Sequence, residues 1–149
     1  NPDLYLTKRT MRLKNHSGEI SLPGGSFDHS QDKNIIDTAL RESKEEIGLQ
    51  LEHAEILGFI DPQISLGTGF IVTPLIAKID PQFSPNINPY EVEEIFKVPL
   101  DFFLDQNNLS HEYRVFDENR WPVYSYNYQE HYIWGLTAQI IRKFCKNLI

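Results

Sequence analysis

Three glutamates near the end of a predicted helix are the residues of this chain best suited to chemistry. Glu42, Glu45 and Glu46 fall on one arc of a helix that turns about 100° per residue. Like charges one turn apart repel by about 0.2–0.5 kcal/mol even when exposed, so a positive partner is expected. Arg41 can reach Glu45 across one turn, but it leaves the other two carboxylates uncompensated. Because Mg²⁺ prefers clustered carboxylate oxygens, the spacing indicates a divalent metal site.

A double glycine ahead of the helix supports the same interpretation. A glutamate cluster alone usually indicates only a solvated helix face. Here the chain reads Leu22-Pro23-Gly24-Gly25 before the helix begins. Glycines permit a positive φ and a close approach of the backbone to a phosphate or a metal. The combination therefore favours a metal and phosphate site over a merely charged surface.

The helix that carries the glutamates has to bury its other side. Its apolar or small side chains share one stripe at helical spacing: Ile36, Ala39, Leu40, Ser43 and Ile47. This pattern predicts a helix near residues 33–47 with one buried face and one acidic face. Further helices are predicted near 99–105 and 133–148, and strands near 4–9, 18–22, 54–61, 69–79, 92–97 and 121–127. Pro74 within a strand predicts an edge or a bulge. By itself, this pattern supports an α+β fold.

Alternating tyrosines mark one of these strands. Tyr124, Tyr126 and Tyr128 are separated by single polar residues, which places the three rings on one face of a strand. These rings and Trp134 could stack on an adenine, but ordinary core packing is the favoured interpretation.

Composition restricts the class of protein. The chain has 149 residues, of which 40% are hydrophobic, and we expect one domain over residues 1–149. The net charge of −7 argues against a nucleic-acid partner, which would call for a basic face. A local basic strip remains at Lys8, Arg9, Arg12 and Lys14; it suits a small phosphorylated ligand, and a charged strand end explains it equally well.

The single cysteine and the hydropathy pattern address the cellular setting. Cys145 has no partner for an internal disulfide and falls in an apolar helix, where a packed thiol is more common than a nucleophile. The sequence contains no apolar run of membrane-spanning length, and the opening Asn1-Pro2-Asp3 does not resemble a signal peptide. We therefore expect a cytoplasmic protein with no membrane partner.

The segment from Arg41 to Leu49 resembles the second half of the Nudix box. That pattern reads R-E-U-x-E-E-x-G-U, with U apolar, and only Ser43 departs from it. The first half departs more, because the loop from Gly25 to Arg41 is two residues longer and Lys33 stands where the general pattern has a glutamate.

The upstream segment resembles the additional signature of the coenzyme A pyrophosphatase branch of this family, L-L-T-x-R-[SA]-x3-R-x3-G-x3-F-P-G-G. The spacing matches throughout residues 5–25, and four positions are substituted: Tyr5, Thr10, Lys14 and Leu22. Members of the branch also carry a lengthened loop with aspartates such as Asp28 and Asp32. Residues 69–74, 91–100 and 133–138 resemble the branch more loosely, so that the likeness covers nearly the whole chain.

The resemblance implies a Nudix α/β/α sandwich with a mixed β-sheet. It also implies metal-dependent hydrolysis of the diphosphate of coenzyme A or acyl-CoA, with Mg²⁺ or Mn²⁺ as cofactor, giving 3′,5′-ADP and 4′-phosphopantetheine. Glu42 and Glu46 would bind the metal directly, Glu45 directly or through water, and Gly24 through its carbonyl. Arg41 would orient Glu45 rather than touch the substrate.

The remaining site residues follow from the same resemblance. Substrate binding is assigned to the basic strip and the glycine loop: Arg9, Arg12, Lys14, His16, Gly24 and Gly25. His16 would contact substrate or order its own loop. A catalytic base could come from Glu91, Glu93 or Glu94, and Glu91 is the first choice. Alternating glutamates on the wet side of a strand explain these three equally simply.

Two alternatives stay open. The chain could be a Nudix hydrolase of another nucleoside diphosphate conjugate, such as ADP-ribose or NADH. It could also be a nucleotide-binding sensor domain without turnover, although Glu42, Glu45 and Glu46 are all retained. A homodimer is among the assemblies that the sequence allows. Branch members usually carry structure before the stretch that matches residues 4–9, so we expect that an N-terminal strand is lacking.

Overall fold

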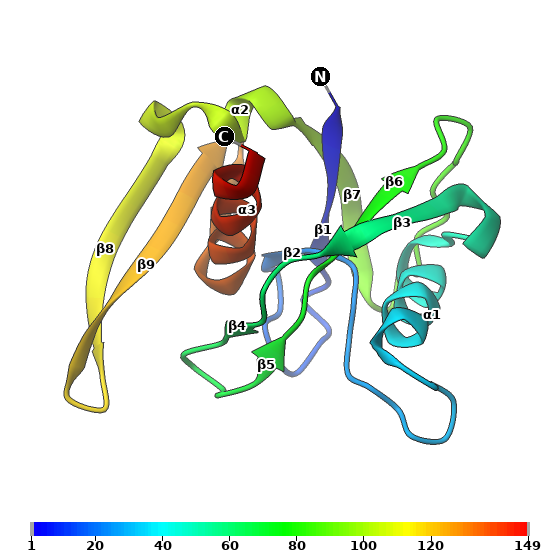
Figure 1. Cartoon of the computed structure of the whole chain (residues 1–149), viewed down its shortest axis with the longest axis horizontal. Coiled ribbons are helices and arrows are strands. Elements are labelled where there is room, and N and C mark those ends of the chain that lie inside the picture. Colours follow the sequence, from blue (N-terminus) through cyan, green and yellow to red (C-terminus); the bar gives the residue numbers. More distant parts are fainter. Residues whose placement is uncertain (1, 149) are drawn as a thin grey trace. The chain divides into compact units, whose positions relative to one another are not determined.

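The structure is a computed structural model that describes residues 2–148 (Figure 1). Its contacts divide the chain into two compact units. We call residues 5–59 and 75–96 the box unit, since they contain the glutamate helix. Residues 2–4, 60–74 and 97–148 form the hairpin unit. Each unit is described by itself.

The box unit is built from short strands and one helix. Strand β2 (Ile20–Ser21) pairs with β1 (Asp3–Arg9) in an antiparallel register that sets Thr7 opposite Ser21, and β7 (Val92–Pro99) follows β1 in the same sheet. Strands β3 (Ala54–Phe59) and β6 (Leu75–Ile79) form an antiparallel ladder with a bulge between Ile56 and Gly58. The 3₁₀ turn η1 (Leu51–His53) leads from α1 into β3.

Helix α1 (Ile35–Ile47) has well-defined ends. At its start, the Asn34 side chain accepts a hydrogen bond from the Asp37 N–H at 2.9 Å. It ends at Gly48, whose φ of 75° is left-handed and whose N–H donates to the Lys44 carbonyl at 3.0 Å. A side chain at Gly48 would be doubly unfavourable, because its Cβ would lie 3.0 Å from Asn86 Cβ. Glycine therefore allows both the helix end and the packing against residue 86.

The core of the box unit is centred on the end of α1. Ile47, Leu49 and Phe83 are buried together, and Tyr5 meets Phe83 edge to face at 5.9 Å between ring centroids. This packing holds the C-terminal turn of α1 in place, and that turn carries the glutamates.

The hairpin unit is organised around a long antiparallel hairpin. Strands β10 (His131–Trp134), β9 (Asn119–Tyr128) and β8 (Leu109–Phe116) pair in that order, and helix α3 (Gly135–Leu148) lies beside β9 (Figure 1). Helix α2 (Leu100–Leu104) and the turn η2 (Gln106–Asn108) precede the hairpin. A small ladder joins β4 (Gln63–Ile64) and β5 (Ile71–Val72).

Several sequence predictions are confirmed in the hairpin unit. The alternating tyrosines lie on β9, and Tyr126 is 1% exposed and packs against Phe103 at 4.9 Å between ring centroids. Core packing is therefore the role of this ring. Cys145 is a buried free thiol, as expected.

No helix among residues 2–148 has the length and apolar character needed to cross a membrane.

Two predicted elements needed correction, and one strand was missed. The strand predicted over 69–79 is interrupted between β5 and β6, where the Ile60 N–H donates to the Pro74 carbonyl at 3.0 Å. The last helix begins at Gly135, because residues 131–134 pair with β9 instead. Strand β8 was not predicted at all. Its residues are mostly exposed on both faces, although Leu109, Tyr113 and Val115 alternate with polar residues, so a strand signal was present in the sequence.

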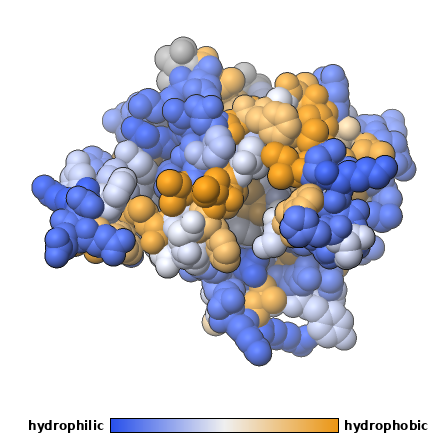
Figure 2. Space-filling view, turned by 60° about the horizontal axis from the view of Figure 1, so that its bottom comes forward, coloured by the Kyte–Doolittle hydropathy of each residue, from blue (hydrophilic) through white to orange (hydrophobic). Residues whose placement is uncertain are grey.

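Exposed apolar side chains are present in both units. Figure 2 shows hydrophobic side chains between polar ones on the face that it displays. Those of the β4–β5 region include Ile64, Phe70 and Ile71, of which Phe70 is 69% exposed.

Candidate active site

Glu46 is the most deeply buried of the three glutamates. It is only 6% exposed, and its Oε1 accepts a long hydrogen bond of 3.5 Å from the Gly24 N–H. The N–H of Asn88 donates to the Glu46 carbonyl at 2.9 Å, so a second segment covers the end of the helix. The prediction of a separate acidic face opposite the buried one was therefore wrong for Glu46, because two loops close over that arc of α1.

Burial makes the negative charge at this end of α1 costly. Loss of solvent is the main cause that raises the pKa of Glu46 to about 7, and the charges of Glu42 and Glu91 raise it further. Burial also raises the pKa of Glu42, against the opposing hydrogen bond from Arg41. The carboxylates thus form a cluster whose ionised form lacks sufficient positive charge nearby.

The second glycine of the loop is required by its contact with Glu42. A Cβ at Gly25 would lie 2.7 Å from Glu42 Oε1 and 2.8 Å from its Cγ, too close for any other residue unless the glutamate moved. The double glycine therefore allows the loop backbone to approach the carboxylate closely, as its position in the sequence suggested.

Arg41 has closer partners than the sequence analysis expected. Its Nε and Nη2 donate to the two carboxylate oxygens of Asp32, each at 2.9 Å, which is a bidentate contact. Its Nη1 donates to Glu42 Oε1 at 3.0 Å, whereas Glu45 Oε2 is 3.6 Å away. Arg41 therefore links the loop aspartate to Glu42, and Glu45, with 48% of its side chain exposed, is the more distant partner.

Asp32, predicted only as an aspartate of the lengthened loop, is the main partner of Arg41. Its side chain is 1% exposed and also accepts 2.9 Å hydrogen bonds from the Asp28 N–H and the Thr38 hydroxyl. Hydrogen bonding from Arg41, above all, holds the pKa of Asp32 well below its usual range. The sequence did contain a sign of this role. Lys33 replaces the box glutamate, and the neighbouring residue in the longer loop, Asp32, is a carboxylate that could take its place.

Glu91 lies near the same carboxylates and is tied to the upstream signature. The charge of Glu91 contributes to the raised pKa of both Glu42 and Glu46. The Thr10 N–H donates to the Glu91 carbonyl at 3.1 Å, and the Thr10 hydroxyl donates to the Tyr90 carbonyl at 3.1 Å. Thr10 is itself buried. The signature segment therefore holds the backbone that carries Glu91.

The other two candidates for the base, Glu93 and Glu94, lie on β7, which begins just after Glu91. Glu93 is exposed and pairs with Lys8 at 3.0 Å between Nζ and Oε2. Glu94 follows it and is partly buried. Glu91 stays the first choice, because its charge acts on both Glu42 and Glu46.

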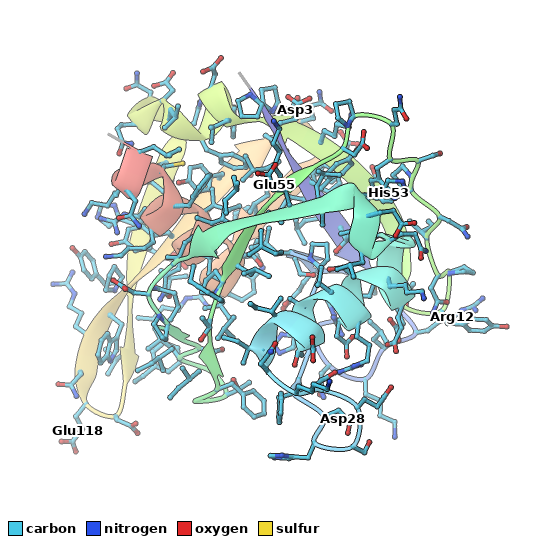
Figure 3. The ribbon with its side chains drawn as sticks, turned by 45° about the vertical axis from the view of Figure 1, so that its right-hand side comes forward. Asp3, Arg12, Asp28, His53, Glu55 and Glu118 are labelled. Carbon is cyan, nitrogen blue, oxygen red and sulfur yellow. The ribbon has the colours of Figure 1, made fainter. Side chains whose placement is uncertain are left out.

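The basic strip divides into a partly buried part and an exposed part. Arg9 lies near Glu46, whose pKa its charge lowers, and its Nε is buried without a hydrogen-bond acceptor among residues 2–148. The guanidinium carbon of Arg12 lies 5.8 Å from the ring centroid of Tyr90. Arg12 extends into solvent, and Asp28 lies in the loop before α1 (Figure 3). Lys14 is exposed.

His16 makes a contact within its own loop. Its Nδ1 lies 3.0 Å from Glu19 Oε2, and its φ of 56° is the left-handed conformation of a tight turn. It is exposed, and the structure gives the loop interpretation a specific contact.

These features lie within the part of the chain that a family model recognises. The model described as the NUDIX domain matches residues 1–118. The chain belongs to the Nudix family. An uncharacterized Nudix hydrolase NudL from Photorhabdus laumondii is 40% identical over 151 aligned residues, covering 99% of this chain and 78% of the relative. NudL from Pectobacterium atrosepticum is 39% identical, covering 95% of this chain and 73% of its own length.

Solved structures show the same fold at low identity. The Nudix domain of Shewanella oneidensis NrtR, crystallised with ADP ribose, matches with a TM-score of 0.58 and 16% identity, over 99% of this chain and 78% of that one. The Caenorhabditis elegans Ap4A hydrolase matches with a TM-score of 0.55 and 19% identity, over 66% of this chain and 70% of that one. The predicted α+β Nudix-type fold is therefore confirmed.

Proposed function

We propose that this Nudix protein hydrolyses the diphosphate of coenzyme A or acyl-CoA, giving 3′,5′-ADP and 4′-phosphopantetheine. The observation that carries the proposal is the double contact of Thr10 with the 90–91 backbone. It joins the segment that resembles the coenzyme A branch to Glu91, whose charge acts on Glu42 and Glu46. A signature that only shaped a surface loop would not need a buried threonine at this position.

The carboxylates fit a divalent metal, which Nudix hydrolases generally use. Glu42 and Glu46 are buried enough that burial raises the pKa of both, so that a cation would relieve a real electrostatic cost. Oxygen ligands of this kind suit Mg²⁺ or Mn²⁺. Glu42 and Glu46 would hold the ion, with Glu45 and the Gly24 carbonyl as further ligands.

When bound, the metal would supply charge neutralisation on the diphosphate and a more acidic water. The chain's own residues supply position. Arg41, held by Asp32, fixes Glu42 through its Nη1 contact of 3.0 Å. Glu91 is the base in this proposal, and it accepts a proton from the water that attacks phosphorus.

Substrate phosphates would be bound by the basic strip and the glycine loop. The Nε of Arg9 is buried and has no acceptor among the described residues, which suits an anionic ligand. Arg12, Lys14 and His16 would contribute from the loop that follows, and the loop at Gly24 and Gly25 would let its backbone approach the phosphates closely. Arg12 and Lys14 would add positive potential rather than a fixed contact, because both side chains are exposed.

A different nucleoside diphosphate conjugate is the second candidate. Two structural neighbours were crystallised as an ADP ribose complex and as an Ap4A hydrolase complex, and the box carboxylates would serve any such diphosphate. ADP-ribose and NADH are therefore the competing substrates. A sensor without turnover is the third, and the presence of all three box glutamates weighs against it.

The test is product analysis with three substrates. The protein would be incubated separately with coenzyme A, ADP-ribose and NADH, with Mg²⁺ or Mn²⁺, and the products would be resolved by chromatography. We expect 3′,5′-ADP from coenzyme A in the presence of metal and none after chelation. Glu46→Gln should keep the fold and lower turnover at least about a hundredfold, because it removes one ligand charge and leaves side-chain size unchanged.

The outcomes separate the candidates. Turnover of ADP-ribose or NADH alone would retain the Nudix chemistry and reject the coenzyme A proposal. Silence with all three substrates would favour the sensor, and full activity of Glu46→Gln would remove Glu46 from the proposed set.

Three broader expectations remain proposals. We propose that residues 1–149 act as one Nudix domain, that the protein works in the cytoplasm, and that a homodimer is the assembly to test. Limited proteolysis, cell fractionation and light scattering test these in turn.

A further inference from the structure

A polar hollow lies within the hairpin unit. It has a volume of about 280 Å³ and is lined by residues from η2, both strands of the hairpin and α3, chiefly Gln106, His111, Tyr113, Tyr124, Arg142 and Lys146. His111 lies opposite Tyr124 across the β8–β9 ladder, so these two side chains emerge on one face of the sheet. The hollow is therefore made where that face meets the last turns of α3.

The charge of this hollow is opposite to that of the chain. The whole sequence carries a net charge of −7, yet two permanently basic side chains and a histidine line the hollow and no aspartate or glutamate does. A concave surface lined by one sign of charge concentrates the potential and attracts ligands of the opposite sign. The ligand that fits is an anion.

Arg142 is held in a way that leaves its donors available. Its guanidinium carbon lies 4.2 Å from the ring centroid of Tyr124. Within residues 2–148 no carboxylate side chain lies within ion-pair distance of Arg142 or Lys146, whereas Arg41 has three such partners and Arg114 has one. A guanidinium stacked on a neutral ring keeps its planar N–H fork, which matches phosphate oxygens in geometry.

Stabilisation of α3 through its helix dipole explains only the two basic residues of this hollow. Basic residues in the last turns of a helix interact favourably with its dipole, and this accounts for Arg142 and Lys146 on α3. It does not account for His111 and Gln106, which reach the same hollow from β8 and η2. Convergence of polar groups from three elements is what distinguishes a binding site from a charged helix end.

We propose that this hollow binds a phosphate monoester, with Arg142 and Lys146 contacting the phosphoryl oxygens and His111 bordering the attached group. The volume of about 280 Å³ suits a phosphate with a sugar-sized substituent rather than a complete dinucleotide. Inorganic phosphate and a nucleoside monophosphate share the chemistry that the site would recognise. The proposal is independent of the proposed diphosphatase activity.

Isothermal titration calorimetry on the full chain tests the proposal. Inorganic phosphate, AMP and adenosine would be titrated separately with a chelator present, so that no metal holds phosphate at the box glutamates. We expect phosphate and AMP to bind and adenosine not to bind. Arg142→Gln and Lys146→Gln should each weaken AMP binding at least about tenfold, because each removes a charge-assisted contact.

Two control variants test whether AMP binds in this hollow and not elsewhere on the chain. Arg120 also lies over a tyrosine, with its guanidinium carbon 4.1 Å from the Tyr113 ring centroid, but it does not line the hollow, so Arg120→Gln should bind AMP normally. Glu46→Gln should also bind normally. Lys146 is exposed, so its variant should fold even if Arg142→Gln does not.

Four results would overturn the proposal. These are the absence of phosphate and AMP binding to the wild-type chain, binding of adenosine equal to that of AMP, AMP binding unchanged in Lys146→Gln, and loss of AMP binding in Glu46→Gln. A larger loss for phosphate than for AMP in Arg142→Gln would support the assignment and show that the organic group adds contacts of its own.

Discussion

At the scale of single residues, the arrangement around Arg41 explains how a Nudix helix can lack the first box glutamate. The longer loop returns Asp32 to a buried position, where it receives four hydrogen bonds. Two of these come from Arg41, so the guanidinium is oriented before it contacts Glu42. Asp32 is therefore a positioning residue in the proposed function.

Replacement of Asp32 tests that role. Asp32→Asn removes the charge and the second acceptor, so we expect kcat to fall at least about tenfold with a smaller change in KM. Asp28→Asn, in the same loop but without a hydrogen bond to Arg41, is the matched control. The double variant with Arg41→Lys should lose less than the sum of the two single losses. Additive losses would show that the two residues act separately.

At the scale of secondary structure, the end of α1 is set by Gly48 and not by helix propensity. The left-handed φ of 75° and the 3.0 Å approach to Asn86 Cβ both exclude a side chain. This turn fixes where Ile47 enters the core and hence where Glu46 lies. The glycine of the box is in this sense a structural requirement of the helix end.

A pair of glycine substitutions measures that requirement. Gly48→Ala should lower the free energy of unfolding by about 1–2 kcal/mol, because alanine in a left-handed conformation is strained. Gly58→Ala, where an added Cβ would meet no atom within 4 Å, should change it far less. Urea unfolding of both variants gives the comparison. Equal effects would mean that the helix end tolerates a side chain.

At the scale of the whole molecule, the buried carboxylates make stability depend on pH when no metal is bound. The pKa of Glu46 rises from 4.5 to about 7 on folding, so the folded state favours the protonated form. The stability from this group is fully present below pH 4.5 and is lost as pH rises toward 7. The raised pKa of Glu42 acts in the same direction. Asp32 behaves oppositely. Its lowered pKa contributes stability above pH 3.8, and this stability is lost as the pH falls further.

We expect the free energy of unfolding, measured with a chelator, to decrease by roughly 3 kcal/mol between pH 4.5 and pH 7 through Glu46. Glu46→Gln should flatten this decrease, and Glu45→Gln, at an exposed position, should not. Added Mg²⁺ should restore stability at pH 7 in the wild-type chain by mass action. A pH dependence that is identical in wild type and Glu46→Gln would contradict the assignment.

The sequence alone determined the features that depend on local order along the chain. The helical spacing of Glu42, Glu45 and Glu46, the glycines on either side of α1 and the alternation on β9 act between near neighbours, so their periods predict the elements that they form. Tertiary structure decided the rest. Distant segments cover Glu46 and join Thr10 to the backbone at Glu91, and the loop before α1 folds back so that Asp32 reaches Arg41. These contacts depend on how the chain folds back on itself, and no spacing within one segment specifies them.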